Sequence, residues 1–290
     1  MSSGLTREPG LQPGTRLAGR YVLGDVIAQG GSSAVHRAED RVLERPVAVK
    51  VVLPQRARDV DASRFTREVR TLAPLAHPSL PAIYDCGEDR DAPYLVMELV
   101  EGSSLAAIIP PGGVERLDEG VQWALQLCGA LAYLHDNGVV HRDVKPRNIL
   151  VTARGRVKLV DLGIAWRVRA GDAAERRRLV PGTPQYLAPE VAAGDEFGPS
   201  SDLYSLGVVL YRLFLGRLPF EGSDASELAW SHHAASPPFP ADIRPGFPPA
   251  LAAVLLRLLA KAPADRYAGA RALADDLAGL RTARDGIAQG

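Results

Sequence analysis

The chain has 290 residues, of which 46% are hydrophobic, and a formal net charge of zero at pH 7. This length and apolar content can build a sizeable core, while the balanced charge favours neither nucleic acid nor a membrane surface as a partner. The two cysteines lie far apart and indicate neither a disulfide framework nor a metal site, so we expect the cytoplasm. No apolar run is long enough to span a membrane, and the start is too polar for a signal peptide.

The first 18 residues carry turn formers and few periodic apolar residues, so we expect a flexible N-terminal tail. Short apolar runs bounded by turn residues then predict three strands, over 21–28, 33–39 and 46–53. A turn with Gly30 and Gly31 joins the first two strands. On its own, this turn indicates no more than a hairpin.

Charged and apolar residues interleave over 60–76, which predicts a helix that ends at His77-Pro78. Two more strands are expected over 82–87 and 93–98. Apolar residues recur at helical spacing over 117–137, which predicts a long helix with Gly138 as its C-terminal stop.

A polar cluster follows this helix, in which Asp143, Lys145 and Asn148 lead into the apolar run 149–151. Loops delivered by rigid strands commonly hold catalytic groups. A second apolar run, 157–160, ends at Asp161. If the two runs pair as a hairpin, three oxygen-bearing side chains meet. Such oxygens suit Mg²⁺ when substrate phosphates complete its shell.

Beyond Asp161 the sequence is irregular up to Gly182. It then predicts a very apolar helix from Asp202 to Leu215, followed by three further helices. We find no internal repeat and no second domain.

Lysine is scarce in this chain. Of the 34 basic residues all but four are arginine, and the lysines are Lys50, Lys145, Lys158 and Lys261. Because the two side chains differ in shape and hydration, we interpret Lys50 and Lys145 as chemical requirements. We interpret the other two as chance retention.

Four segments resemble motifs of the bacterial eukaryotic-like (Hanks-type) Ser/Thr protein kinases. Residues 47–50 match V-A-I-K, 141–148 match the catalytic loop H-R-D-x-x-x-x-N, 161–163 stand in the place of D-F-G, and 182–190 match the segment ending in A-P-E. The glycine-rich loop departs from the family pattern, since Ala28 and Ser33 occupy the first and third glycine places.

The resemblance implies an α+β, two-lobed protein-kinase-like fold. A small N-terminal lobe, an antiparallel sheet with one main helix, would cover 19–98. A larger, mostly helical C-terminal lobe would cover 99–281. Residues 1–18 and 282–290 would form tails.

The resemblance also implies an ATP site. Lys50 would bind the α- and β-phosphates and pair with Glu68, although a surface glutamate among arginines is an alternative interpretation. Asn148 and Asp161 would hold Mg²⁺, with Mn²⁺ as an alternative. Further nucleotide contacts, several equally explained as core packing, are implied at Ile27, Ala28, Gly30, Gly31, Val35, Ala48, Met97, Glu98, Val100 and Leu150. Among these, Met97 would guard a back pocket, and Glu98 and Val100 would bind adenine through their backbones.

For catalysis, the resemblance implies that Asp143 accepts or orients the proton of the substrate hydroxyl. Lys145 would contact the γ-phosphate, which favours Ser/Thr over Tyr substrates. Thr183 would hydrogen-bond with both and shape the substrate pocket.

Five other residues complete the expectations. Asp202 would accept backbone hydrogen bonds from the catalytic loop, with a plain helix N-terminal acid as the alternative, and Arg266 would pair with Glu190. We interpret His135 and Trp123 as packing or surface residues.

The implied activity is transfer of the γ-phosphoryl group of ATP to Ser/Thr hydroxyls of proteins, this chain included, in bacterial signalling. A homodimer is left open. One alternative is a pseudokinase that binds nucleotide or partners, supported only by the missing glycines. Another is a small-molecule phosphotransferase, against which the A-P-E segment and the Glu190–Arg266 pair argue.

The segment between Gly163 and Gly182 contains no Ser, Thr or Tyr. In relatives, an arginine in the position of Arg142 often binds a phosphothreonine there. Our hypothesis is that Glu175, or with less support Asp172, supplies a permanent negative charge instead. A solvated charged loop is the equal alternative.

Overall fold

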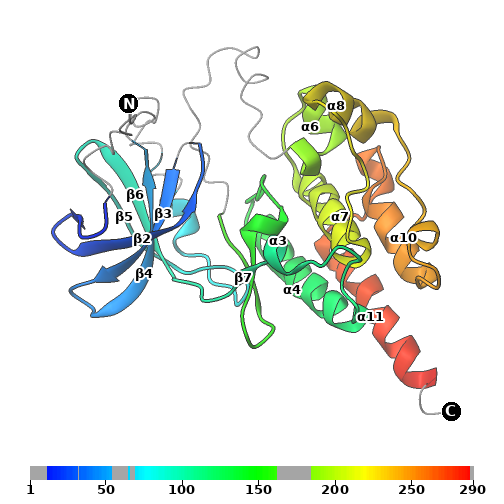
Figure 1. Cartoon of the computed structure of the whole chain (residues 1–290), viewed down its shortest axis with the longest axis horizontal. Coiled ribbons are helices and arrows are strands. Elements are labelled where there is room, and N and C mark those ends of the chain that lie inside the picture. The colour runs from blue at the N-terminus through cyan, green and yellow to red at the C-terminus, as the bar shows by residue number, and fades with distance from the viewer. Residues whose placement is uncertain (1–11, 32, 54–64, 66–68, 162–183, 288–290) are drawn as a thin grey trace, which may run out of the picture. The chain divides into compact units, whose positions relative to one another are not determined.

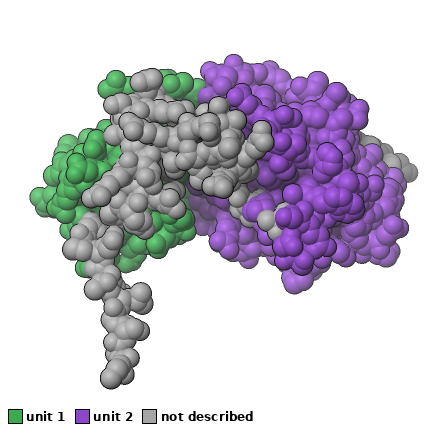
Figure 2. Space-filling view, turned by 90° about the horizontal axis from the view of Figure 1, so that it is seen from above, with its two compact units in different colours: residues 1–76, 81–100, 164–170 green, residues 77–80, 101–163, 171–290 purple. Residues whose placement is uncertain are grey.

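The computed structural model describes residues 12–31, 33–53, 65, 69–161 and 184–287. Within this part, the chain divides into two compact units, coloured separately in Figure 2. Unit 1 comprises the described residues of 1–76 and 81–100, and unit 2 those of 77–80 and 101–287. The observed boundary after Val100 lies two residues beyond the boundary expected between 98 and 99.

Unit 1 is built on a six-stranded antiparallel sheet with the order β1-β2-β3-β4-β6-β5 (Figure 1). Its strands are β1 (Arg16–Leu17), β2 (Tyr21–Gln29), β3 (Ser33–Asp40), β4 (Arg45–Val52), β5 (Ile83–Asp89) and β6 (Ala92–Met97). The last five agree with the predicted strands to within two residues. In the central strand β4, the side chains of Val47, Val49 and Val51 are fully buried in the core of the unit.

Strand β1 corrects the expectation of a flexible tail through residue 18. Arg16 pairs with Val22 and Leu17 with Tyr21, and the Leu17 side chain is buried in the unit 1 core. The Ala18 N–H donates to the Asp89 carboxylate at 2.9 Å. A two-residue strand is too short to show the alternation by which strands are predicted.

Unit 2 is mostly helical (Figure 1). Its helices are α3 (Leu105–Ile108), α4 (Leu117–Asp136), α6 (Pro189–Ala193), α7 (Pro199–Leu215), α8 (Ala225–Ala234), α9 (Pro240–Ile243), α10 (Pro249–Leu258) and α11 (Ala270–Ile287). Three 3₁₀ turns are η1 (Pro146–Asn148), η2 (Pro184–Tyr186) and η3 (Pro263–Asp265), and a small sheet has the order β7 (Ser103–Ser104), β8 (Ile149–Val151) and β9 (Val157–Leu159).

Helix ends follow local chemistry. The long helix α4 stops as predicted at Gly138, whose φ of 71° suits glycine and whose N–H donates to the His135 carbonyl. Helix α7 begins at Pro199, three residues before the expected start, because proline is well suited to the first helical turn. Helix α11 extends to Ile287, beyond the expected start of a C-terminal tail at 282, because the added residues include Arg and Ala, which favour helix.

The three helices expected after α7 correspond to α8, α10 and α11, and the four-residue α9 is an addition. No helix in the described ranges combines the length and apolar character that a membrane span needs.

Candidate active site

The backbone just before Asp143 is held by one buried carboxylate on α7. Asp202 accepts the N–H of His141 and the N–H of Arg142, each at 2.8 Å. Arg142 has a φ of 69°, a left-handed conformation that costs a residue with a side chain about 1–2 kcal/mol. The two hydrogen bonds offset this strain, and they confirm the predicted role of Asp202.

His135 is a third partner of Asp202, which corrects its interpretation as a mere packing or surface residue. Its Nε2 lies 2.9 Å from Asp202 Oδ2, and its side chain is 10% exposed. The two residues are 67 positions apart, so no local pattern could reveal the pair. Trp123, by contrast, is buried, as its interpretation as a packing residue requires.

His141 is fully buried beside the loop that it begins. Its Nδ1 accepts the N–H of Asp143 at 3.3 Å. Burial lowers the pKa of His141, while attraction to the carboxylates of Asp202, Asp143 and Asp161 works in the opposite direction. A neutral imidazole agrees both with the lowered pKa and with Nδ1 acting as the acceptor of the Asp143 N–H. Three carboxylates therefore gather around one imidazole.

The structure brings Asp143, Lys145 and Asn148 together, as the sequence predicts. Asp143 Oδ2 lies 2.7 Å from Lys145 Nζ and accepts from Asn148 Nδ2 at 2.8 Å. Asn148 Nδ2 also donates to the Asp143 carbonyl at 2.9 Å. The side chains of Asp143 and Lys145 are 22% and 20% exposed, so a substrate can reach them.

The predicted hairpin over 149–160 is confirmed. Strands β8 and β9 pair antiparallel, with Leu150 opposite Lys158, and the Val160 N–H donates to the Asn148 carbonyl at 2.8 Å. This bond places Asn148 beside the residue that precedes Asp161. Both predicted metal ligands therefore lie at the same end of one hairpin.

The donor set at this end fits Mg²⁺. Because Asp143 engages the amide nitrogen of Asn148, the Asn148 oxygen is the atom directed to other partners. Asp161 adds a carboxylate and has a left-handed backbone with φ 59°. An amide oxygen and a carboxylate are hard ligands, and one or two such protein groups usually suffice when substrate phosphates complete the shell.

In unit 1, the strand register gathers the predicted nucleotide residues on one face of the sheet. Residues directly opposite each other in antiparallel strands share a face, as do alternate residues of one strand. Val35 pairs with both Ala28 and Lys50, and Ala48 pairs with Met97. These five residues therefore lie on a common face, with Lys50 only 6% exposed.

The glycine-rich turn is a tight hairpin closed by the Gly30 N–H, which donates to the Ser33 carbonyl at 2.9 Å. An added Cβ would meet only ordinary contact at Gly30 and nothing within 4 Å at Gly31, and neither φ is left-handed. The fold itself therefore does not require glycine at either position. Ala28 pairs with Val35, directly after a register shift in β2, and Ser33 pairs with Val52, so both positions without the family glycine are paired within the sheet. Ile27, which precedes them, is 52% exposed.

The segment after β6 carries the residues expected to bind adenine. The Glu98 N–H donates to the Ala82 carbonyl at 2.8 Å, and Glu98 Oε2 accepts the Ala82 N–H at 3.2 Å. The Glu98 N–H is thus used within unit 1, and adenine binding by the backbone of Glu98 stays a prediction. Met97 and Val100 are half-buried. Leu150, expected on the other side of the base, lies in β8 of unit 2.

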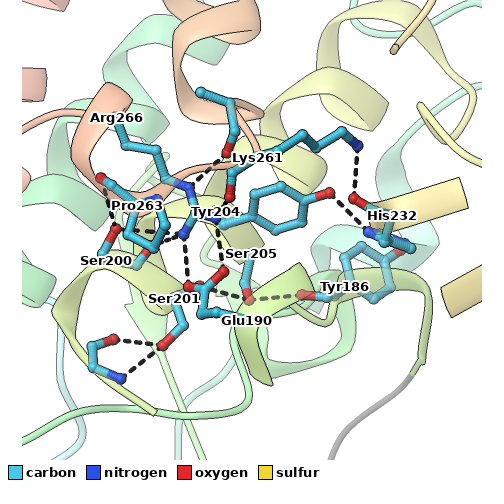
Figure 3. A network of polar contacts seen from close by, with 12 residues as sticks. Tyr186, Glu190, Ser200, Ser201, Tyr204, Ser205, His232, Lys261, Pro263 and Arg266 are labelled. Carbon is cyan, nitrogen blue, oxygen red and sulfur yellow. Dashed lines mark hydrogen bonds and ion pairs between the residues drawn. The ribbon is translucent and has the colours of Figure 1, made fainter. Parts of the chain in front are cut away.

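The predicted pair of Glu190 and Arg266 is confirmed, and Figure 3 shows it at the centre of a polar network. Arg266 binds both Glu190 carboxylate oxygens, at 2.7 and 2.8 Å, and its side chain is fully buried. It also donates to the carbonyls of Ala260, Lys261 and Ser200. Bidentate, charge-assisted bonds of this kind are strong and directional. They fasten α6 to α7 and to the turn before η3.

The same network fixes the chain directly after Thr183. Ser205 Oγ donates to the Tyr186 carbonyl at 2.7 Å, and Arg212 Nη1 donates to the Tyr186 hydroxyl at 2.8 Å (Figure 3 labels Tyr186 and Ser205). Both donors come from α7. Turn η2 is therefore anchored on the most buried helix of unit 2.

Lys158 and Lys261, interpreted from the sequence as chance retention, both bind backbone carbonyls. Lys158 Nζ donates to the Leu80 carbonyl at 2.9 Å, and Lys261 Nζ donates to the carbonyls of His232, at 2.7 Å, and Ser231, at 3.3 Å. Figure 3 shows Lys261 reaching His232. Each ammonium caps backbone carbonyls in a half-buried place.

Several predicted residues lie outside the described part of the chain. They are Glu68 and Thr183 of the predicted site, Leu162 and Gly163 of the D-F-G position, and Glu175 and Asp172 of the regulatory hypothesis.

A match to the family described as protein kinase domain spans residues 21–277. The chain is 41% identical over 266 residues to the serine/threonine-protein kinase PknB of Mycobacterium leprae, covering 90% of this chain and 43% of that protein. It is 40% identical over 269 residues to PknB of Mycobacterium tuberculosis (strain ATCC 25618 / H37Rv), covering 91% and 43%. It is 37% identical over 265 residues to the serine/threonine-protein kinase PrkC of Bacillus subtilis, covering 91% and 41%. The chain thus spans about two-fifths of the length of these relatives.

Proposed function

The chain belongs to the protein kinase domain family, and from this premise we propose that it transfers the γ-phosphoryl group of ATP to serine or threonine hydroxyls of proteins. The observation that carries the proposal is the arrangement at Asp143. Lys145 and Asn148 both bind Asp143 Oδ2, so the carboxylate is held in one orientation while Oδ1 is directed to other partners. A half-buried, oriented carboxylate beside an ammonium is suited to accept a hydrogen bond from a substrate hydroxyl.

Asp143 accepts a hydrogen bond from the substrate hydroxyl and points its oxygen toward the phosphorus atom. As the new O–P bond forms, the bond between the γ-phosphorus and the β,γ-bridging oxygen breaks and ADP leaves, while the hydroxyl proton passes to the Asp143 carboxylate. Lys145, already beside that carboxylate, stabilises the negative charge on the γ-phosphoryl oxygens. Most of the rate enhancement in such a site comes from positioning and electrostatics.

Lys50 binds the α- and β-phosphates, and Val35, Ala48 and Met97 form the apolar face for adenine. Asn148 and Asp161 hold a divalent cation, for which we propose Mg²⁺, with Mn²⁺ as a substitute. When bound, this cation screens the charge between the phosphates. Glu68 as the partner of Lys50, and Thr183 as the pocket residue, remain part of the proposal.

Three considerations support Ser/Thr protein substrates. Lys145 stands where Ser/Thr members of the family carry a lysine, the relatives are named serine/threonine-protein kinases, and the Glu190–Arg266 pair is typical of protein kinases. We propose that the reaction takes place in the cytoplasm as a step of bacterial signalling, with the chain among its own substrates.

The alternative of a scaffold without catalysis depended on Ala28 and Ser33 in the glycine places. Because both residues are paired within the sheet, this support is weak. No other observation favours it.

The test is transfer of labelled phosphate from ATP to a generic protein substrate such as casein. We expect transfer by the wild type and near-complete loss in Asp143→Asn, with nucleotide affinity by calorimetry largely retained. An Asp143→Asn protein with wild-type turnover would contradict the proposal.

A further inference from the structure

Strands β8 and β9 form a very short hairpin, and the two proposed metal ligands lie at one end of it. Each strand has three residues, and Asn148 and Asp161 lie at its open end. Two-stranded hairpins are marginally stable in water, even when they are longer, and the only further strand in this sheet among the described residues is the two-residue β7, which pairs with β8. Groups outside the hairpin must therefore hold its orientation.

One such group is the side-chain amide of Gln126, in the middle of α4. Its Nε2 donates to the Gly155 carbonyl at 3.1 Å, and its Oε1 accepts the Val157 N–H at 2.9 Å. Gln126 thus uses both halves of its amide on the closed end of the hairpin. Among side chains of this length, only an amide offers a donor and an acceptor together at neutral pH.

The two bonded groups flank the tightest part of the hairpin. Gly155 has a φ of 70°, and the turn is closed by bonds between Thr152 and both Gly155 and Arg156. Val157 is the first residue of β9 and is fully buried. Gln126 therefore ties the turn and the start of β9 to a helix whose core-facing residues are rigidly packed.

We propose that Gln126 is a positioning residue for the metal site: through the backbone of Gly155 and Val157, it sets the orientation in which the hairpin presents Asn148 and Asp161. This inference rests on the proposed function, because the metal role of those two residues is part of it. Gln126 touches neither metal nor substrate and acts only through the hairpin.

Gln126→Glu gives a reversible test. The carboxylate places an acceptor where the Nε2 donor was, and its repulsion by the Gly155 carbonyl should displace the side chain from the hairpin, so that the bond from the Val157 N–H is lost as well. Once protonated, the acid regains an O–H donor and resembles the amide. Gln126→Leu removes both bonds at all pH values. Glu119→Leu, at an exposed position on the same helix, is the matched control for a new leucine.

The primary readout is Mn²⁺ affinity in the presence of a non-hydrolysable ATP analogue, measured by electron paramagnetic resonance from pH 8 to pH 5.5. Relative to wild type at each pH, we expect Gln126→Leu to bind Mn²⁺ about tenfold more weakly throughout. Gln126→Glu should show a similar defect at pH 8 that shrinks as the pH falls. Glu119→Leu should match wild type.

A second readout is hydrogen–deuterium exchange, which requires neither a bound metal nor an active enzyme. In the metal-free wild type, the Val157 amide should exchange with deuterium slowly, and in Gln126→Glu at pH 8 its exchange should be at least tenfold faster. If Gln126→Leu does not fold, the pH series of Gln126→Glu and this measurement still decide the matter.

Two results would overturn the inference. Wild-type metal affinity in both Gln126 variants would show that the hairpin is positioned without this residue. Val157 amide exchange in Gln126→Glu at pH 8 as slow as in wild type would show that loss of the amide donor does not loosen the hairpin. A wild-type protein that binds no Mn²⁺ with the analogue would instead refute the metal assignment in the proposed function, and this inference with it.

Discussion

The two hairpins of the candidate site, β2–β3 and β8–β9, are built in opposite ways. Strands β2 and β3 contain nine and eight residues, and their own backbone pairing extends over most of that length. Strands β8 and β9 contain three residues each, and side chains from elsewhere in unit 2 bind their backbone neighbours. The hairpin β2–β3 is stabilised mainly by its own backbone pairing, and the hairpin β8–β9 also by side-chain hydrogen bonds from outside it.

The difference matches what each hairpin has to present. The groups expected to act from β2–β3 are apolar side chains and backbone amides, which tolerate small displacements. The groups at the end of β8–β9 are the two proposed oxygen ligands, for which an error of a fraction of an ångström is costly. Polar anchors are concentrated where side-chain geometry has to be accurate.

The largest expected effect tests whether the sheet that contains β2 and β3 also contributes a chemically essential group, in addition to packing against the nucleotide. Lys50, beside this hairpin on β4, is almost fully buried. Lys50→Arg keeps the charge but replaces a compact ammonium with a planar fork. We expect at least a hundredfold loss of phosphoryl transfer, about 3 kcal/mol of transition-state stabilisation. Arg41→Lys, in the exposed turn after β3, should retain full activity. A near-normal rate in Lys50→Arg would contradict the chemical role inferred from the scarcity of lysine.

The next largest effect concerns the loop that leads into β8. Asp202→Asn replaces a buried acceptor of three donors by a group with only one oxygen, and it leaves the strain at Arg142 poorly compensated. We expect a loss of about 3 kcal/mol in the free energy of unfolding, measured with urea, together with reduced turnover. Asp275→Asn, exposed on α11, is the control. Equal stabilities of the two variants would show that the carboxylate does not hold the loop.

A polar anchor outside both hairpins gives a pH test of the same idea. Burial, and to a lesser extent the charge of Arg266, lowers the pKa of Lys261 to about 8 from 10.5. Between these values the unfolded chain binds a proton that the folded chain does not, so raising the pH favours folding. The unfolding free energy of the wild type should therefore rise relative to Lys261→Met between pH 8 and pH 10. A relative fall over this window would mean that the folded state stabilises the charged amine.

The smallest effect compares the two turns directly. Gly31 in the first hairpin and Gly155 in the second both have open space around an added Cβ, but only Gly155 has a left-handed φ. Gly31→Ala should change the unfolding free energy by less than about 0.5 kcal/mol, and Gly155→Ala should lower it by about 1 kcal/mol. Thermal unfolding of both variants measures the difference. The reverse order would contradict the description of the two turns.

Features with a local signal could be predicted from the sequence. The five longer strands of unit 1, the β8–β9 hairpin and the stop at Gly138 follow from periodicity and turn residues. The partners of Asp202 in the loop and the Glu190–Arg266 pair followed from the family resemblance, and the structure contains both.

Features that depend on distant partners were missed or misinterpreted. Gln126 meets Val157 across 31 positions, and Lys158 meets Leu80 across 78 positions. Neither residue belongs to a motif, and each is an ordinary choice for its helix or strand. A sequence pattern reports which face a residue occupies, but not which backbone atom its polar end will reach.

The placement of the lysines has a practical consequence for chemical labelling. None of the four side-chain amines is fully exposed, and two belong to the candidate site. Amine-directed reagents therefore have few readily accessible lysine side chains to modify in this chain. Of the lysines, the one beside Asp143 is partly accessible and the one on β4 is shielded. The extent of acylation at these two amines, read by mass spectrometry, would report nucleotide occupancy without any introduced probe.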